Sequence, residues 1–263
     1  MLQSISRYIH AFFLMQRYNW KIDMIYRTQW VLWLLVVSFP IIVGFISISI
    51  IYNVSNGING WTYYQLLALA GFSNLMIGTL GYVLNPWNLV NYMRNGSFDQ
   101  LLLKPYNPIF MIISRMGWEV RISSMISALV LIIYGLINTQ TNILAIATAF
   151  FMFALGTVAI IMFFILISVL SYVLFKSGKY VQWIISILGT ASQYPLTIYS
   201  LAGILLFTLL LPIGLASFYT AELLFTKIDY SLVFVLAVFA IILSYIFYKT
   251  TMWLLKFYTS GGG

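Results

Sequence analysis

The sequence contains no cysteine and a single histidine, His10. Disulfides, thiolate metal sites and cysteine nucleophiles are therefore excluded, and a histidine-ligated metal centre is not expected. Charged residues are also scarce, at 7% of the chain, whereas a typical soluble domain has about 25%. Because 62% of the residues are hydrophobic, the chain lacks the polar surface that a soluble globule, a disordered chain or a coiled coil needs. The composition predicts an integral membrane protein.

Long apolar stretches between the ionisable residues indicate where the membrane spans lie. A helix that crosses about 30 Å of hydrocarbon needs roughly 20 apolar residues. Two of the longest stretches divide at turn-forming segments, 53–60 and 138–142. The region 180–221 is too long for one span and awkward for two. An all-α protein is therefore predicted, with spans near 30–52, 61–84, 118–137, 143–170, within 180–221 and near 231–252.

The basic residues predict the orientation of these spans. With the N-terminus inside, every one of the 13 Lys and Arg residues except Lys227 falls on the cytoplasmic side, which is the positive-inside bias of membrane proteins. Two full spans within 180–221 would place the C-terminal lysines outside and weaken this bias. The region is therefore predicted to hold one span and a re-entrant outer segment, with helix breaks at Pro195 and Pro212. The result is six spans with both termini in the cytoplasm.

The N-terminal segment, 1–28, does not resemble a signal peptide, because basic residues and Asp23 interrupt any apolar core. Its apolar residues recur near helical spacing, which predicts an amphipathic helix lying along the cytoplasmic interface. A frayed basic tail is the alternative. The predicted organisation is this helix, a membrane domain at 29–257 and a C-terminal tail at 258–263.

The spans lack the groups with which membrane enzymes and proton-coupled carriers work. Their central parts contain no ionisable residue, although charged side chains usually mark functional sites inside membranes. No phosphate-binding Gly-x-x-x-x-Gly-Lys-Ser/Thr motif occurs, and the nearest string, 176–180, lacks the first glycine and the hydroxyl. Glu119 lies four residues after Arg115 and is predicted to form a structural ion pair with it. The chain is therefore predicted not to be an enzyme, and energy for transport would come from another subunit.

The longest predicted cytoplasmic loop, 85–108, contains a short predicted helix at 98–104. A turn at 95–96 precedes it, Ser97 can cap it and Pro105 ends it. Exposed leucines on such a helix require a partner, either a protein groove or lipid; a loop that merely lies on lipid headgroups is the alternative. The leucines expected on the surface are Leu101, Leu102 and Leu103.

Four segments resemble motifs of one family. Residues 96–105, Gly-Ser-Phe-Asp-Gln-Leu-Leu-Leu-Lys-Pro, are similar to a signature of bacterial ABC-2 family transporter permeases, specifically the small six-span branch. Residues 194–199 resemble the family's Tyr-Pro segment. Residues 211–221 resemble a further stretch, although Thr220 stands where proline is usual. Residues 258–262 resemble the common ending. The resemblance covers nearly the whole chain, with the segments in order.

Membership of this family implies a permease that pairs with a second permease, the same chain or a related one, in the bacterial cytoplasmic membrane. Each permease contacts a cytoplasmic ABC ATPase subunit, which binds the ATP and Mg; no cofactor is expected in this chain. The loop helix is then the coupling helix, the N-terminal helix is the connecting helix, and the re-entrant segment closes the pathway. The resemblance assigns ATPase coupling to Arg94, Gly96, Phe98, Asp99, Leu101, Leu102, Lys104 and Pro105.

The favoured mechanism is export by alternating access, through a pathway between the two permeases. Because the spans are uncharged, the pathway is expected to be aromatic and hydroxyl-bearing, and a drug-like compound, organic cation, lipid or peptide would suit it. Ordinary anchoring at the bilayer interface is the alternative for these aromatics. Glu222 is either an exit-gate residue that attracts cationic cargo or the partner of Lys227. The candidate pathway residues are Tyr63, Tyr64, Tyr194, Tyr199, Phe218, Tyr219 and Glu222.

Two other functions fit the same composition. One is an ATP-independent secondary carrier or channel. The other is a membrane assembly or immunity protein that binds a partner without moving cargo. Identification of the subunits that co-purify with the chain separates these readings from the exporter.

Overall fold

The computed structural model describes residues 2–55, 58, 60–84, 86–115, 122–139, 141–226 and 229–260. Within these ranges the secondary structure is helical, apart from one isolated bridge between Ile58 and Trp61. Within the described residues, short 3-10 and π-helical turns join or extend the α-helices: η1 (Met24–Tyr26), η3 (Leu196–Ile198), η4 (Leu206–Leu210, the π turn) and η5 (Leu255–Phe257). The α-helices are α1 (Leu2–Asp23), α2 (Arg27–Ser55), α3 (Tyr63–Val83), α4 (Pro86–Arg94), α5 (Asp99–Leu102), α6 (Pro108–Arg115), α7 (Ile122–Ile137), α8 (Ile143–Phe175), α9 (Lys179–Ala191), α10 (Leu201–Leu205), α11 (Ile213–Ala216), α12 (Phe218–Phe225) and α13 (Tyr230–Leu254).

Local capping chemistry explains where the longest helices begin and end. The Asn142 side chain accepts a hydrogen bond from the backbone N–H of Leu144 at 3.2 Å and starts α8. Lys176, with φ of 49°, ends the same helix in the left-handed region. The Asp229 carboxylate accepts bonds from the first turn of α13. The Asn142 and Asp229 N-caps each contribute about 1 kcal/mol, so the starts of these two helices follow from local sequence.

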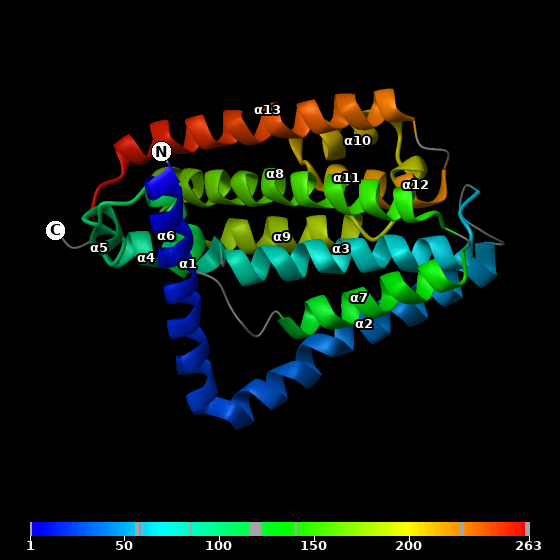
Figure 1. The fold of residues 1–263 in the computed structure, drawn as a ribbon, viewed down its shortest axis with the longest axis horizontal. Helices are drawn as coiled ribbons and strands as arrows, with labels where there is room; N and C mark the ends of the chain where they lie inside the picture. The colour runs from blue at the N-terminus through cyan, green and yellow to red at the C-terminus, as the bar shows by residue number, and fades with distance from the viewer. Residues whose placement is uncertain are drawn as a thin grey trace.

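The long helices run along one axis, and α1 crosses one end of the bundle (Figure 1). That end also holds α4, α5, α6 and both ends of the chain. We call it the basic end, and the end that carries α12 and the α7–α8 turn the opposite end. Basic residues gather at this end: Arg94 ends α4, Lys176 follows α8, Lys179 begins α9 and Lys256 lies in η5.

Helix α8 is the centre of the fold and packs against α13, α12, α11 and α4. Its backbone touches α11 directly: a Cβ atom at Gly156 would lie 2.6 Å from the backbone N of Ala216. Helices α3 and α7 approach equally closely, since a Cβ at Gly135 would lie 2.8 Å from the Tyr64 carbonyl oxygen. Small residues allow such contacts between membrane helices, where dispersion rather than water drives association.

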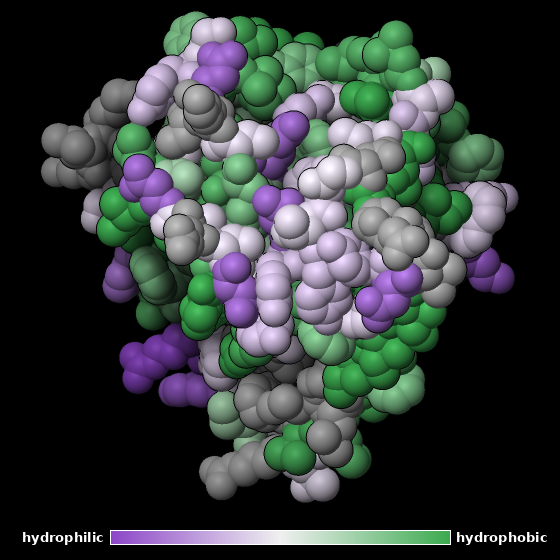
Figure 2. Space-filling model, turned by 90° about the vertical axis from the view of Figure 1, so that its right-hand side faces the viewer, coloured by the Kyte–Doolittle hydropathy of each residue, from purple (hydrophilic) through white to green (hydrophobic). Residues whose placement is uncertain are grey.

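Three helical stretches within the described residues are long and apolar enough to cross a membrane, Tyr63–Arg94, Ile143–Phe175 and Tyr230–Phe257. A fourth is possible if Leu201–Leu210 and Ile213–Phe225, which meet at 83°, form one broken span. Figure 2, an end-on view of the opposite end, shows polar residues gathered across its centre and hydrophobic residues around the rim. A polar end with apolar flanks is the surface of an integral membrane protein.

The helix bounds agree with most of the predicted spans. Helices α2, α3 and α13 match the spans at 30–52, 61–84 and 231–252, and α8 runs beyond its predicted end at 170 because the apolar run continues to Phe175. The predicted breaks at Pro195 and Pro212 are confirmed: both residues lie between helices, and the 83° bend falls at Leu211–Pro212.

Three predictions at the basic end need correction or lie partly or wholly outside the described residues. The loop at 85–108 is largely helical, because Pro86 starts α4, where a helix needs no backbone donor. The span at 118–137 is seen as α7 only from Ile122 onward. The predicted Arg115–Glu119 pair falls outside the described part of the chain, since Glu119 lies within 116–121.

The predicted N-terminal helix is present as α1. Its Gln16 amide donates to the Ser114 carbonyl oxygen at 3.3 Å, and the Tyr82 hydroxyl donates to the Gln16 amide oxygen at 3.2 Å. Ile9 and Phe13 are exposed on its outer side. The helix thus docks through polar groups and leaves apolar side chains outward, as expected of a helix at a membrane interface.

Candidate functional site

The segment Arg94–Pro105 lies at the basic end between α4 and α6. Gly96, with φ of +71°, makes the turn that the sequence predicts, since other residues rarely adopt this conformation. The helix that follows, α5, spans only Asp99–Leu102 and is shorter than the predicted 98–104. Phe98 rather than Ser97 holds the cap position, and it makes no side-chain capping bond. The shape of this segment therefore depends on tertiary contacts.

The leucines of this segment divide into a buried and an exposed set. Leu101 is 0% exposed and packs in the main core with Phe98, so the prediction that it is exposed is wrong. The two residues are three positions apart and therefore face the same side of a helical turn. Leu102 and Leu103 are 40% and 86% exposed. The apolar surface that needs a partner is therefore the Leu102–Leu103 pair, flanked by the exposed Lys104 and Pro105.

The C-terminal segment, Tyr258–Ser260, closes over Arg94–Pro105, which we call the coupling segment after its predicted role. The Ser260 hydroxyl donates to the Asp99 carboxylate at 2.6 Å, and the Tyr258 hydroxyl donates to the Met93 carbonyl oxygen at 3.2 Å. The Tyr258 ring also packs edge-on against Phe98, with centroids 5.2 Å apart. Burial, together with the neighbouring Asp99 carboxylate, raises the pKa of Tyr258 and keeps its hydroxyl protonated as a donor.

Helix α1 holds the chain just beyond the coupling segment. The backbone N–H of Asn107 donates to the Tyr8 hydroxyl at 3.3 Å, and the Tyr8 ring packs edge-on against Phe110. Arg7 donates to the Pro105 carbonyl oxygen at 3.5 Å and lies over the Tyr106 ring. The coupling segment is thus bounded on one side by the C-terminal segment and on the other by α1.

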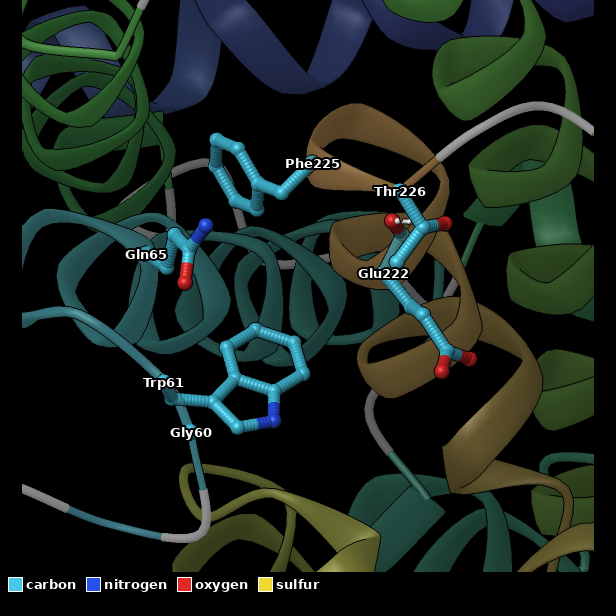
Figure 3. Close-up of a pocket in the computed structure, with 6 residues that line it drawn as sticks. All are labelled: Gly60, Trp61, Gln65, Glu222, Phe225 and Thr226. Carbon is cyan, nitrogen blue, oxygen red and sulfur yellow. Dashed lines mark hydrogen bonds between the residues drawn. The ribbon is translucent and has the colours of Figure 1, made fainter.

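At the opposite end, a cavity of about 210 Å³ brings the start of α3 next to the end of α12. Glu222 reaches it from α12, and Figure 3 shows its carboxylate and the Trp61 indole on opposite sides of the space. Glu222 is half-buried, and its carboxylate has no hydrogen bond or ion pair with any residue that the structure describes. Lys227, its predicted alternative partner, lies outside the described residues. The lining residues are Gly60, Trp61, Gln65, Glu222, Phe225 and Thr226.

The other candidate pathway residues fall into separate groups. Tyr63 and Tyr64 are neighbours at the start of α3: the Tyr63 hydroxyl is 2.8 Å from Ser49 Oγ, and Tyr64 packs against Tyr134. Phe218 is 5% exposed and packs against Trp61, so it lies behind the cavity wall. The Tyr219 hydroxyl is 3.4 Å from Thr208 Oγ1. The roles of these residues in cargo movement stay predictions.

Tyr194 and Tyr199 line a second, open cavity of about 420 Å³ together with Ser186 and Thr190 of α9. Ser186 and Thr190 continue a stripe that begins at Gln182, because residues four apart share one helix face. All three side chains of the stripe are exposed. Exposed hydroxyl and amide groups on a helix in lipid are unfavourable unless water or protein covers them. This face of α9 therefore differs from the apolar outer face of α13, where Phe234, Val235, Ile241 and Ile242 are exposed.

Sequence reasoning did not find several residues of these sites. Trp61, Gln65 and Phe225 line the cavity around Glu222, and Tyr258 and Ser260 contact the coupling segment. The contact of Tyr258 and Ser260 could have been expected, because residues 96–105 and 258–262 both resemble family motifs and both fall on the predicted cytoplasmic side. No local sequence pattern indicates the residues that line the Glu222 cavity. Within the described residues, no group of three or more metal-ligating side chains occurs.

The bundle of long apolar helices, with its polar end, defines an integral membrane protein. The sequence profile of the family described as ABC-2 family transporter protein matches residues 38–262. The chain belongs to this family, as its motifs indicate. No curated protein and no solved structure matched the chain. Permeases of this family are the transmembrane components of transporters and are not themselves catalytic.

Proposed function

We propose that this chain is the permease subunit of an ATP-driven exporter in a bacterial cytoplasmic membrane. Permeases of the family work with ABC ATPase partners. The observation that carries the proposal is the exposed Leu102–Leu103 pair, which lies at the basic end beside both ends of the chain. Full burial of a leucine stabilises a contact by roughly 1.5–3 kcal/mol, so a groove in the ATPase that covers both side chains would hold the subunits together.

The proposed orientation places the basic end in the cytoplasm. The alternating directions of α2, α3, α7, α8, α9 and α13 in Figure 1 fit six crossings with both termini on one side. Helix α9 has only 13 residues, about 20 Å of helix at 1.5 Å per residue, so its crossing needs the chain beyond Ser192. A C-terminal reporter is expected to be active only inside the cell; activity only outside would contradict this topology.

The proposed pathway follows the polar stripe of α9 toward the cavity of Tyr194 and Tyr199. A second permease facing α9 would enclose Gln182, Ser186 and Thr190 and remove them from lipid. Alternating access would then move cargo along this interface to the opposite end. The lining is uncharged, so it suits amphipathic or hydrophobic cargo of the drug-like, lipid or peptide kinds.

The cavity around Glu222 supports a preference for cationic cargo at the exit. The Glu222 carboxylate, which has no partner among the described residues, and the Trp61 indole face the same cavity from opposite sides. They offer a charge and an aromatic face, and both attract an organic cation. If Glu222 is instead the partner of Lys227 in a surface loop, replacement by Gln will leave export of every cation unchanged.

Purification in mild detergent tests the proposed function directly. We expect an ABC ATPase to co-purify with the chain and to be lost when Leu102 and Leu103 are both replaced by Asp. The matched control replaces both with Met, which keeps an apolar surface and is expected to retain the ATPase. A carrier, a channel or a non-transporting assembly protein would purify without an ABC ATPase in all three cases.

A further inference from the structure

The coupling segment is poorly suited to transmit force through its own secondary structure. Helix α5 has four residues, and so short a helix is not stable alone, because helix nucleation is unfavourable. The chain on each side turns, at Gly96 and again before α6. A push on Leu103 would bend such a segment unless other contacts make it stiff.

The C-terminal segment supplies contacts of this kind. Ser260 bonds the Asp99 carboxylate at the start of α5, and Tyr258 bonds the carbonyl of Met93 near the end of α4. The two bonds hold the turn between α4 and α5 from both sides. The Ser260–Asp99 bond is exposed, and the Tyr258–Met93 bond is partly buried.

The same segment is joined to two of the long helices. Tyr258 follows η5, the direct continuation of α13. The Tyr172 hydroxyl, from the last turns of α8, donates to the Thr259 carbonyl oxygen at 2.5 Å, and the Tyr172 and Tyr258 rings pack with centroids 5.4 Å apart. Both long helices extend from the basic end toward the opposite end (Figure 1).

We propose that Tyr258–Ser260 is a clasp that fixes the coupling segment to the ends of α8 and α13. When the ATPase moves α5, the clasp makes α8 and α13 move with it, and the movement reaches the opposite end. Tyr258 and Ser260 are thus positioning residues for coupling and do not themselves bind the ATPase. This inference rests on the proposed function, since it takes the ATPase as the source of movement.

The absence of native cysteine makes a reversible test possible. In a variant with Asp99→Cys and Ser260→Cys, reduction leaves the clasp open and oxidation closes it by a disulfide. The permease–ATPase complex is compared with and without ATP and vanadate by hydrogen–deuterium exchange of α10, α11 and α12 at the opposite end. This readout requires no knowledge of the cargo. The two single variants under the same oxidant are the controls, and Tyr258→Phe opens the clasp at its other bond.

In the wild-type complex, we expect ATP and vanadate to change exchange at the opposite end. Because Asp99 itself lies in the coupling segment, the reduced double variant is compared with its own oxidised form, which lacks Asp99 equally. Between these two forms, ATPase binding and ATP hydrolysis should be the same, while the change in exchange should be about fivefold smaller in the reduced form, within the usual range of coupling between distant sites. Oxidation should restore the change, and reductant should abolish it again. Tyr258→Phe should reduce it less, because the ring contacts remain.

Other results overturn the clasp. If the reduced variant responds as the wild type does, Tyr258–Ser260 only packs against the fold. If oxidation suppresses the response, the clasp must open for transport, and rigid transmission is wrong. If the oxidised double variant keeps its ATPase and the reduced form loses it, Tyr258–Ser260 belongs to the docking surface. If the wild-type complex itself shows no response, alternating access fails, and the clasp fails with it.

Discussion

The two ends of the bundle are built in contrasting ways. At the basic end, three parts of the chain meet through directed polar contacts: Ser260 with Asp99, Tyr258 with Met93 and Tyr172 with Thr259. At the opposite end, α12 and the start of α3 face each other across a cavity, and the Glu222 carboxylate has no partner among the described residues. The contacts at the basic end would let its three parts move together. The cavity at the opposite end offers space that a ligand could enter.

The largest effect is expected from the buried side of the coupling segment. Leu101→Asp would place a charge where the native side chain is 0% exposed, and we expect the free energy of unfolding to fall by about 4 kcal/mol or more. Thermal unfolding in detergent measures this loss. Leu101→Met is the matched control and should fold normally. An unchanged unfolding temperature for Leu101→Asp would show that this leucine faces outward after all.

The exposed side of the same segment should respond in the opposite way. Replacing Leu102 and Leu103 with Asp is expected to leave the unfolding temperature nearly unchanged, because their side chains are 40% and 86% exposed. Loss of two buried leucines from the docking contact would weaken ATPase binding by about 3 kcal/mol or more, roughly a hundredfold. Titration of the purified subunits measures the affinity. Equal binding by the variant would remove α5 from the interface.

The sequence alone predicts the long helices but not which side of the coupling segment is buried. Apolar length, turn residues and prolines predicted α2, α3, α8 and α13 and the breaks around Pro195 and Pro212, because each depends on local sequence. The sequence predicts Leu101 on the surface, because the pattern of a short loop segment does not indicate which other parts of the chain pack against it. Its spacing of three from Phe98 is a helical signal, but only tertiary packing shows that this face is the inner one.

The contacts that define both candidate sites join residues far apart in sequence. Ser260 and Asp99 are 161 positions apart. The Glu222 cavity lies between the start of α3 and the end of α12, and no local sequence pattern indicates that these two helices meet. Glu222 itself was identified because acids are scarce in this chain. Its neighbours Trp61 and Phe225 are common residue types here, so composition gave no reason to select them.

An intermediate effect is expected at the opposite end. Glu222→Gln should slow export of an organic cation about fivefold, because a contact between a half-buried carboxylate and a cation contributes about 1 kcal/mol. Thr226→Ala alters the same cavity without a charge change and is the control. Efflux of cationic and neutral dyes from vesicles, compared at equal amounts of folded complex, gives the measurement. An equal reduction for cationic and neutral dyes would argue against a role for the charge.

The smallest effect is expected at α1. Arg7→Ala removes an exposed hydrogen bond to Pro105 and the contact with the Tyr106 ring, which should cost about 0.5 kcal/mol. Thermal unfolding detects this change, with Arg7→Lys as a partly conservative control. A loss of several kcal/mol would mean that α1 stabilises the basic end far more than these contacts indicate.

The most direct test of the account is site-specific crosslinking from the two ends. Because the chain has no cysteine, Leu103→Cys and Thr226→Cys each supply one thiol in this chain for a photoreactive maleimide, at the basic and the opposite end respectively. After illumination of membranes, we predict a covalent adduct with an ABC ATPase from Leu103→Cys and none from Thr226→Cys. An ATPase adduct from Thr226→Cys, or its absence from Leu103→Cys, would contradict the assignment of the basic end as the coupling side.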